Sequence, residues 1–470
     1  MSKAENKTYD AIIIGAGIGG LVCGCYLAKA GMKVLIAEQH HTPGGYCTSF
    51  RRGEYLFDAG PHCFGSYRKG GMTRRIFEEL GIDKALNIFR ADPSDVLMTP
   101  GRQISFWNDL EKTIAGLQAL FPDEASNIRA FLTLLVDTEP KSFSLLRRAT
   151  FKTVLDQYFV NDTLKAILGF PLLAVNGLPP SLISAFVGAK LYSEFIFDGG
   201  YYPLGGMQKL ADSVVAQYQL FGGEVRLSTR VRNINVDDGR VAGVLLDNGD
   251  FIESRYVISN IDARQTFLDL LGEEQIDPIF CRKLKSMMPS LSNFIIYLGM
   301  DGDFRPSLNP GTAFHFFSHY DVEKAYHAVE KGDFAGYGGY AFRVAHDYST
   351  IYAGMPAPFN SGPYWAQNKQ PTLERLVESI EQNSMHNFKK HIVYKDAATP
   401  QTMYRYTSNY QGAAYGWAGI PSQIIIPDFH KPSFIKGLYL VGHWTTLGVG
   451  ISGVAYVGYD TARTIAGRKK

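Results

Sequence analysis

The chain has 470 residues, of which 46% are hydrophobic and 20% charged, and its formal net charge is +2. This length exceeds the roughly 250–300 residues at which one hydrophobic core stops growing, so we expect two closely packed domains. The balanced charge gives no basic footprint for nucleic acid, which excludes that class of partner.

The five cysteines are odd in number and include no C-x-x-C pair, and no secretory segment precedes the first predicted strand. We therefore expect a cytoplasmic protein, either free or peripherally bound at the inner face of the membrane. No uninterrupted apolar run of about 18 residues is present, so a membrane-spanning helix is not expected. The most apolar stretch, 166–197, is broken by Pro179, Pro180 and Lys190, and could contact a membrane surface.

The opening segment reads as a strand, a glycine-rich loop, a helix and a second strand. Residues 9–14 are rich in β-branched side chains, which is typical of a buried parallel strand. A helical pattern over 21–30 is ended by Gly31, and a second strand over 33–37 ends in Glu38. This order predicts a βαβ unit that binds a dinucleotide.

The loop has the spacing Gly15-x-Gly17-x-x-Gly20. Gly15 permits a tight turn, Gly17 lets the backbone approach a pyrophosphate, and Gly20 allows close helix packing, while the helix N-terminus stabilises the anion. Glu38 is placed to accept hydrogen bonds from the adenosine ribose. Because Gln39 follows it and no arginine stands beside it, the site disfavours the 2′-phosphate of NADP.

NAD and FAD share adenosine and pyrophosphate, so this unit alone does not distinguish them. After Glu38 the chain continues with HHTPGGYCTSFRRGEYLFDAGPH, in which Gly44 and Gly45 offer a second bare backbone patch. A plain dehydrogenase does not need this extension; the alternative is an ordinary glycine turn before a hairpin. Near the C-terminus a strand over 438–441, a glycine-rich loop and a helix provide another helix N-terminus suited to a ligand.

Together these segments resemble the FAD-dependent amine-oxidase-like superfamily, in its branch of phytoene desaturases, carotenoid isomerases and retinol saturases. The resemblance spans nearly the full length and rests on IIIGAGIGGL, HHTPGGYCTSF, FDAGPH, YYPLGGMQKLADSV, VRNINVDDGRVAGVLLDNGDFIESRYVISNIDA, TPQTMYRYTSNYQGAAYGW and GLYLVGHWTTLGVGISGVAYVGYDTARTIAG, in this order. It implies an α/β fold with a Rossmann-like FAD-binding domain of the glutathione-reductase type and a discontinuous α+β substrate domain. We place the FAD-binding domain at 1–68, 199–265 and 420–470, and the substrate domain, with a helical lid that could contact a membrane, at 69–198 and 266–419.

The resemblance implies FAD as the cofactor and places its contacts at both ends of the chain. The expected contact residues are Gly15, Gly17, Gly19, Gly20, Glu38, Gln39, Gly44, Gly45, Val231, Gly442, Gly450, Ile451 and Val454. Val231 is expected near the adenine. Many relatives carry an acidic residue directly after the glycine that matches Gly442, whereas this chain has His443.

Three residues are candidates for chemistry. His62 is a near-neutral titrating group that could pass a proton, or a hydrogen-bonded structural histidine. Arg405 could stabilise reduced flavin or bind a substrate head group, or form an internal salt bridge. His443 is expected to border the isoalloxazine. No metal site is predicted, because the histidine pairs lack an H-E-x-x-H pattern or a cysteine partner.

By this resemblance the function is that of an FAD-dependent oxidoreductase that desaturates or saturates a hydrophobic polyene or isoprenoid by hydride exchange at flavin N5. The alternatives are a redox-neutral cis–trans isomerase that uses reduced FAD, and a lipid or prenyl carrier like the GDP-dissociation inhibitors. The oligomeric state is open. Candidate tunnel walls, which are equally explained as core packing, are 166–197, Tyr404, Tyr406, Tyr410, Tyr415 and Trp417.

Overall fold

The βαβ unit at the start of the chain forms as predicted. The computed structural model describes residues 8–137, 144–424, 426, 429–445 and 450–467. In it β1 (Tyr9–Ile14) lies parallel to β2 (Val34–Ala37), and α1 (Ile18–Lys29) connects them. The helix begins three residues earlier than the sequence pattern indicates, because Gly17, with an extended backbone, is its N-cap.

The first large sheet surrounds this unit, with β1 near its middle. Both neighbours of β1, β2 and β12, run parallel to it, while β10, β11 and β12 form an antiparallel meander at one side. Among the described residues its further strands are β9 (Glu224–Arg226), β10 (Val231–Asp237), β11 (Arg240–Leu246), β12 (Phe251–Ser259) and β18 (Leu438–Leu440).

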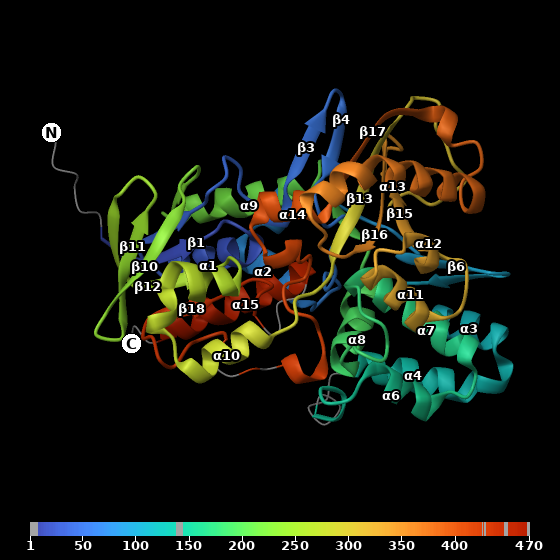
Figure 1. Cartoon of the computed structure of the whole chain (residues 1–470), viewed down its shortest axis with the longest axis horizontal. Helices are drawn as coiled ribbons and strands as arrows, with labels where there is room; N and C mark the ends of the chain where they lie inside the picture. Colours follow the sequence, from blue (N-terminus) through green and yellow to red (C-terminus); the bar gives the residue numbers. More distant parts are fainter. Residues whose placement is uncertain (1–7, 138–143, 425, 427–428, 446–449, 468–470) are drawn as a thin grey trace.

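Both faces of this sheet are buried, which is why β1 is a continuous apolar run. Ala11 and Ile13 face a cluster formed with α1, α9 (Met207–Leu220), α15 (Gly450–Ala466) and α2 (Met72–Leu80). Ile12 and Ile14 face the opposite cluster, which includes residues of α10 (Pro278–Ser286). Figure 1 shows α1, α9 and α15 side by side, so the first and last helices are neighbours.

A second large sheet forms the core of the other lobe. Its strand order is β17-β13-β16-β15-β14-β6-β7, antiparallel except for the parallel pair β14–β6. Its strands are β6 (Asp95–Thr99), β7 (Arg102–Phe106), β13 (Ser292–Met300), β14 (Ala313–Phe317), β15 (Gly339–Val344), β16 (Thr350–Ala357) and β17 (Ile392–Ala398). The segment 69–198, assigned from its sequence to the substrate domain and its helical lid, thus contributes the hairpin β6–β7, which turns at Pro100 and Gly101.

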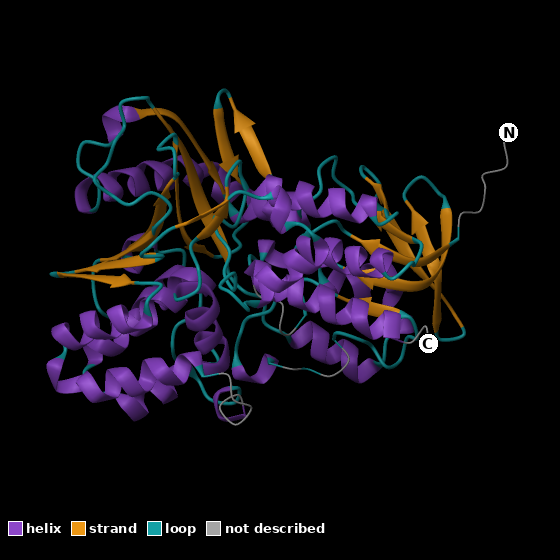
Figure 2. Cartoon of the chain, turned by 180° about the vertical axis from the view of Figure 1, so that it is seen from behind, coloured by secondary structure: helices purple, strands orange, loops and turns teal. Residues whose placement is uncertain are grey.

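Helices cover the second sheet and extend from it as a separate group, seen from behind in Figure 2. They bury one apolar cluster together with the sheet. These helices are α3 (Leu110–Leu120), α4 (Ala125–Val136), α6 (Phe151–Tyr158), α7 (Asp162–Asn176), α8 (Ala185–Leu191), α11 (Val322–Glu330), α12 (Phe334–Tyr337) and α13 (Gly362–Asn383). The helix α14 (Pro400–Thr407) packs through Met403 into a separate small cluster with residues of β4, β13 and β17. Short hairpins and pairs complete the fold: β3 (Ser49–Arg52) with β4 (Tyr55–Asp58), and β5 (Ile88–Arg90) with β8 (Tyr201–Pro203).

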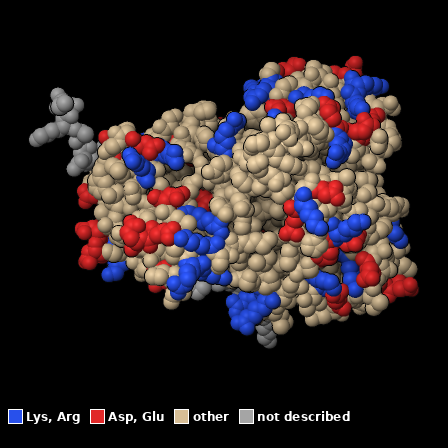
Figure 3. Space-filling view, viewed as in Figure 1, with Lys and Arg blue, Asp and Glu red and all other residues tan. Residues whose placement is uncertain are grey.

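The surface carries both signs of charge. Figure 3 shows lysine, arginine, aspartate and glutamate interspersed over both lobes, with a mostly uncharged strip between them. Within the described ranges, every helix is too short or too polar to cross a lipid bilayer.

Candidate functional site

One large cavity, of about 1040 Å³, is lined by residues from both lobes. Every residue predicted to contact the cofactor lines it except Gly20, which instead packs where a Cβ atom would lie 2.6 Å from the Gly15 carbonyl oxygen. His62 and His443 also line the cavity. The residues that the sequence places at opposite ends of the chain therefore meet at one site.

The two N-terminal glycine patches are in direct contact. The Gly44 N–H donates a hydrogen bond to the Ala16 carbonyl at 2.8 Å, and Gly17 pairs with Gly44 as a short parallel bridge. A Cβ atom on Gly45 would lie 3.3 Å from the Gly17 Cα. The backbone is therefore bare on both sides of the N-terminus of α1, as a pyrophosphate requires.

The C-terminal segment closes on the same helix. A Cβ atom on Gly19 would lie 3.0 Å from the Gly442 nitrogen, and one on Gly458 would lie 2.3 Å from the Gly19 carbonyl oxygen. Gly450, Ile451 and Val454, predicted as a turn, form the start of helix α15. Residues 446–449 of the predicted glycine-rich loop lie outside the described residues.

Asn260 joins these glycines, and the sequence analysis did not assign it a role. Its Nδ2 donates to the Gly15 carbonyl at 3.2 Å. Cβ atoms on Gly17, Gly19 and Gly442 would each lie 2.7–2.9 Å from its amide atoms. Its position could have indicated this role, because Asn260 directly follows β12. Since β12 runs parallel to β1, both strands end at the edge of the sheet where α/β folds bind ligands.

Backbone N–H groups of the adjacent loops hold the Glu38 carboxylate in place. Its Oε2 accepts from the Ala16 N–H at 2.7 Å and its Oε1 from the His40 N–H at 2.9 Å, and the residue is 7% exposed. Each oxygen retains a lone pair for a ribose hydroxyl. The bare glycine cradle and this oriented carboxylate fit the adenosine diphosphate half of a dinucleotide.

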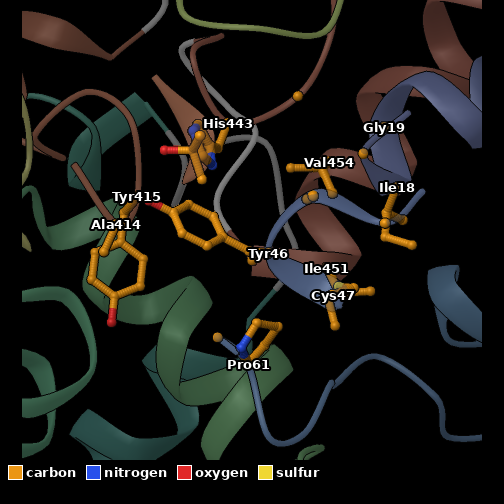
Figure 4. Close-up of a pocket in the computed structure, with 18 of the residues that line it drawn as sticks. Ile18, Gly19, Tyr46, Cys47, Pro61, Ala414, Tyr415, His443, Ile451 and Val454 are labelled. Atoms are coloured by element: carbon orange, nitrogen blue, oxygen red, sulfur yellow. The ribbon is translucent and has the colours of Figure 1, made fainter. Parts of the chain in front are cut away.

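Beyond the cradle, aromatic side chains and His443 form the wall of the cavity (Figure 4). The Tyr46 hydroxyl donates to the Ala413 carbonyl at 3.0 Å, and the ring centroids of Tyr46 and His443 are 5.8 Å apart. Figure 4 shows Tyr415 beside Tyr46, and Pro61 on the other side of the opening. Burial lowers the pKa of His443 to about 4, so its imidazole is neutral at pH 7.

His62 packs against a tyrosine of the second lobe. Its ring centroid is 3.4 Å from that of Tyr352, on β16. Burial, and then the positive charge of Arg343, lower the pKa of His62 to about 3. His62 is therefore neutral at pH 7, unlike the near-neutral titrating group that the sequence suggested.

Arg405 is not brought into this group. It is exposed on α14, its guanidinium lies 5.0 Å from the ring centroid of Tyr406, and it is not part of the cavity wall. The role at the cofactor or at a substrate head group therefore has no geometric support.

Part of the predicted tunnel wall is found in the cavity. From 166–197 the wall includes Val175 of α7, Phe186, Val187 and Leu191 of α8, and Phe195, and it also includes Tyr404, Tyr406 and Tyr415. Tyr410 and Trp417 pack elsewhere: Trp417 donates from Nε1 to the Trp444 carbonyl at 2.9 Å, and the Arg264 guanidinium lies 3.8 Å from the Tyr410 ring centroid.

Comparisons with known proteins place this site in context. The chain is 28% identical to rat (Rattus norvegicus) all-trans-retinol 13,14-reductase over 362 residues, which cover 69% of this chain and 59% of the reductase. It is 25% identical to carrot (Daucus carota) chloroplastic prolycopene isomerase, covering 98% of this chain and 80% of the isomerase. It is also 25% identical to the neurosporene-forming phytoene desaturase of Rhodobacter capsulatus, covering 99% and 95% respectively.

The fold is shared with solved structures. An oxidoreductase from Methanosarcina mazei superposes with a TM-score of 0.70 at 16% identity, covering 96% of this chain and 99% of that chain. This likeness confirms the predicted fold class. The family of flavin-containing amine oxidoreductases matches residues 18–331. That match covers more than half of the sequence and confirms the expected FAD cofactor, so the chain belongs to the flavin-containing amine oxidoreductase family.

Proposed function

We propose that this protein is an FAD-dependent oxidoreductase that exchanges hydride with a carbon–carbon bond of a long apolar polyene or isoprenoid. The observation that carries the proposal is the continuity of one cavity. Its wall runs from Gly17 and Glu38, at the dinucleotide cradle, to Val175 and Leu191, in the helical part of the other lobe. A cofactor and an extended apolar molecule can therefore share one continuous space.

The cradle residues bind and orient the dinucleotide half of the cofactor. The helix N-terminus at Gly17 and the bare backbone of Gly44 and Gly45 receive the pyrophosphate, and Glu38 accepts from the ribose. A bound flavin supplies an N5 atom that accepts or donates hydride. Tyr46, Tyr415 and His443 shield the adjoining part of the cavity from water.

The histidines of the wall favour positioning over acid–base catalysis. Both His62 and His443 are neutral at pH 7, since burial lowers their pKa values to about 3 and about 4. A neutral imidazole is not a cationic acid, and with a pKa this low it is also a weak base. We infer that His62 and His443 orient the reactants and that the substrate's conjugation accommodates developing charge. Substrate placement within about 3–3.5 Å of the reacting atom is then the main contribution of the protein.

Experiment must establish whether the enzyme adds or removes hydride. The three similar proteins named above are a reductase, an isomerase and a desaturase, and the same site geometry suits addition of hydride, its removal, or its transfer and return. Anaerobic incubations of the holoprotein, oxidised or prereduced, with phytoene, prolycopene and all-trans-retinol separate these outcomes by product mass. Turnover of none of them, with flavin present, contradicts the proposal. Retention of bound lipid by a Gly17→Val variant that lacks flavin would instead indicate a carrier.

We infer in addition that the helical part of the second lobe contacts a membrane surface, from which an insoluble substrate can enter. Leu145 and Val160 are 74% and 90% exposed there, and Arg148 and Lys152 are exposed nearby. Apolar side chains beside cations are typical of peripheral membrane contacts. Co-flotation with vesicles of anionic lipid, and its loss in a Leu145→Asp, Val160→Asp variant, checks this. Our prediction of a cytoplasmic location rests on the free cysteines.

A further inference from the structure

A row of polar side chains crosses the cavity-facing side of the second sheet. In the strand register, Asp95 of β6 pairs with Ala313 of β14, and Ala313 pairs with Arg343 of β15. Paired residues share a face of a sheet, as do residues two apart on one strand. His315 and its partner Ala341 therefore lie on the same face, and all five residues line the cavity.

The alternation of the two strands fixes this face. Between Ala313 and His315 stands Phe314, and between Ala341 and Arg343 stands Phe342. These two phenylalanines are buried in the core and stack on each other, with ring centroids 5.1 Å apart. A one-residue slip would expose both rings, so the register is strongly determined. The two alanines leave open space between the polar side chains.

Two of these polar side chains lack the partners that their chemistry requires. In the described part of the chain no carboxylate lies within ion-pair distance of Arg343, whose polar contact is the weakly accepting Cys63 thiol. His315 Nε2 and Asp95 Oδ1 are 2.8 Å apart and both residues are buried, at 3% and 2% exposure. The other ring nitrogen, His315 Nδ1, is buried without a hydrogen-bond partner.

A hydrocarbon substrate would leave Arg343 without an anionic partner. A partly buried guanidinium has five donors, and its desolvation is compensated only by an anion or several oxygens. Arg343 is not needed by the dinucleotide cradle, which lies on the edge of the other sheet, at Gly17 and Gly44.

We propose that the substrate ends in a carboxylate, which Arg343 binds on the floor of the cavity, beside the His315–Asp95 pair. This inference rests on the proposed function and specifies its substrate class: an apolar chain with one ionised end. Arginine matches a carboxylate through two parallel hydrogen bonds.

The test compares three ligands of one carbon skeleton at the FAD-loaded protein: all-trans-retinoic acid, its methyl ester and all-trans-retinol. Binding at pH 7.5 is followed by the change in flavin absorbance. We expect the acid to bind at least about tenfold more tightly than the ester or the alcohol, as for a charge-assisted hydrogen-bonded pair. Arg343→Gln should remove this preference while leaving the dissociation constant of the ester unchanged, and Arg343→Lys should restore part of it.

The matched control is Arg232→Gln, on the exposed side of β10, which should behave like the wild type. Flavin content and thermal midpoint are measured for every variant. Arg343→Met, which keeps most of the side-chain length without the charge, provides a second variant in case Arg343→Gln does not fold, and it should also weaken binding of the acid selectively.

Three results overturn the inference: equal binding of acid and ester, equal weakening of both by Arg343→Gln, or loss of flavin from that variant. Binding of none of the three ligands overturns it as well. The proposed function fails separately, when neither these ligands nor phytoene and prolycopene are converted. Conversion of the hydrocarbons, with no preference for the acid, overturns only the carboxylate inference.

Discussion

Gly19 of α1 and Gly442, which follows β18, approach so closely that a Cβ atom on Gly19 would lie 3.0 Å from the Gly442 nitrogen. Asn260 occupies the remaining space, since the same Cβ atom would lie 2.9 Å from its Oδ1. Two backbone segments and one amide side chain therefore meet without room for a methyl group.

Substitution of Gly19 by valine should separate these segments. Overpacking of this kind costs about 1–3 kcal/mol of unfolding free energy, and displacement of the α1 N-terminus should weaken flavin binding at least about tenfold. The flavin-to-protein ratio after purification and urea unfolding provide the two measurements. Gly116→Ala, at an exposed position of α3 with open space around it, is the control and should be neutral or slightly stabilising. A Gly19→Val protein with full flavin content would refute the close convergence.

Glu38→Gln should weaken binding of the cofactor. The amide oxygen can still accept from the Ala16 N–H, but the NH2 group then faces the His40 N–H, and the charge that strengthens hydrogen bonds to the ribose, worth about 1.5–3 kcal/mol, is lost. We expect the dissociation constant for FAD to rise by about one to two orders of magnitude, measured by titration of the flavin-depleted protein. Glu253→Gln, at an exposed position of β12, should leave it unchanged. An unchanged constant in Glu38→Gln would show that this carboxylate only supports the loop.

Acid should destabilise the protein through its buried histidines. His62 has a pKa of about 3 when folded against 6.5 in the unfolded chain, so only the unfolded chain gains its proton as the pH falls. The lowered value means that the stability due to this group is complete above pH 6.5 and is lost toward pH 3. Between pH 7 and pH 5 the loss is at most about 2 kcal/mol. In urea unfolding of the FAD-saturated proteins, the unfolding free energy of His62→Gln should therefore fall by about 2 kcal/mol less between pH 7 and pH 5 than that of the wild type. An equal fall in both proteins would contradict the burial of a neutral imidazole at His62.

Val175→Trp should obstruct the apolar end of the cavity without disturbing the cradle. Val175 belongs to α7 and lines the cavity, far along the chain from the glycine loops. Flavin content should equal that of the wild type, while KM for a polyene substrate rises severalfold because the indole occupies substrate space. Val393→Trp, at an exposed position of β17, is the control. A parallel fall in flavin content would mean that the two ends of the cavity are not independent.

The cofactor site was predictable from sequence because its chemistry depends on glycines at fixed spacing. At Gly15, Gly17 and Gly44 a Cβ atom would lie 2.8–3.0 Å from the side chains of Ile261, Asn260 and Ala211, and such positions leave a local signature. Asn260 leaves none: an asparagine at the end of a strand is common, and only the parallel pairing of β12 with β1 brings it to the loop.

The second lobe was less predictable, since its site residues become neighbours only through strand register. Asp95 and Arg343 lie on one row because β14 separates their strands, and β6 joins that sheet from a segment that reads as mainly helical. Arg405 shows the opposite limit. The motif around it matched related sequences, yet Arg405 is exposed on α14 and does not line the cavity, unlike its neighbours Tyr404 and Tyr406.

The packing of α15 onto α1 has a consequence for biosynthesis. Gly458 fits against the Gly19 carbonyl, so α15 covers a helix, α1, that leaves the ribosome long before it does. Until then the nascent polypeptide presents an apolar helix face without this cover, which favours shielding by a chaperone. Capture of the vitamin-derived prosthetic group should therefore follow synthesis of α15, and a stop codon placed before that helix should be as damaging as an early one.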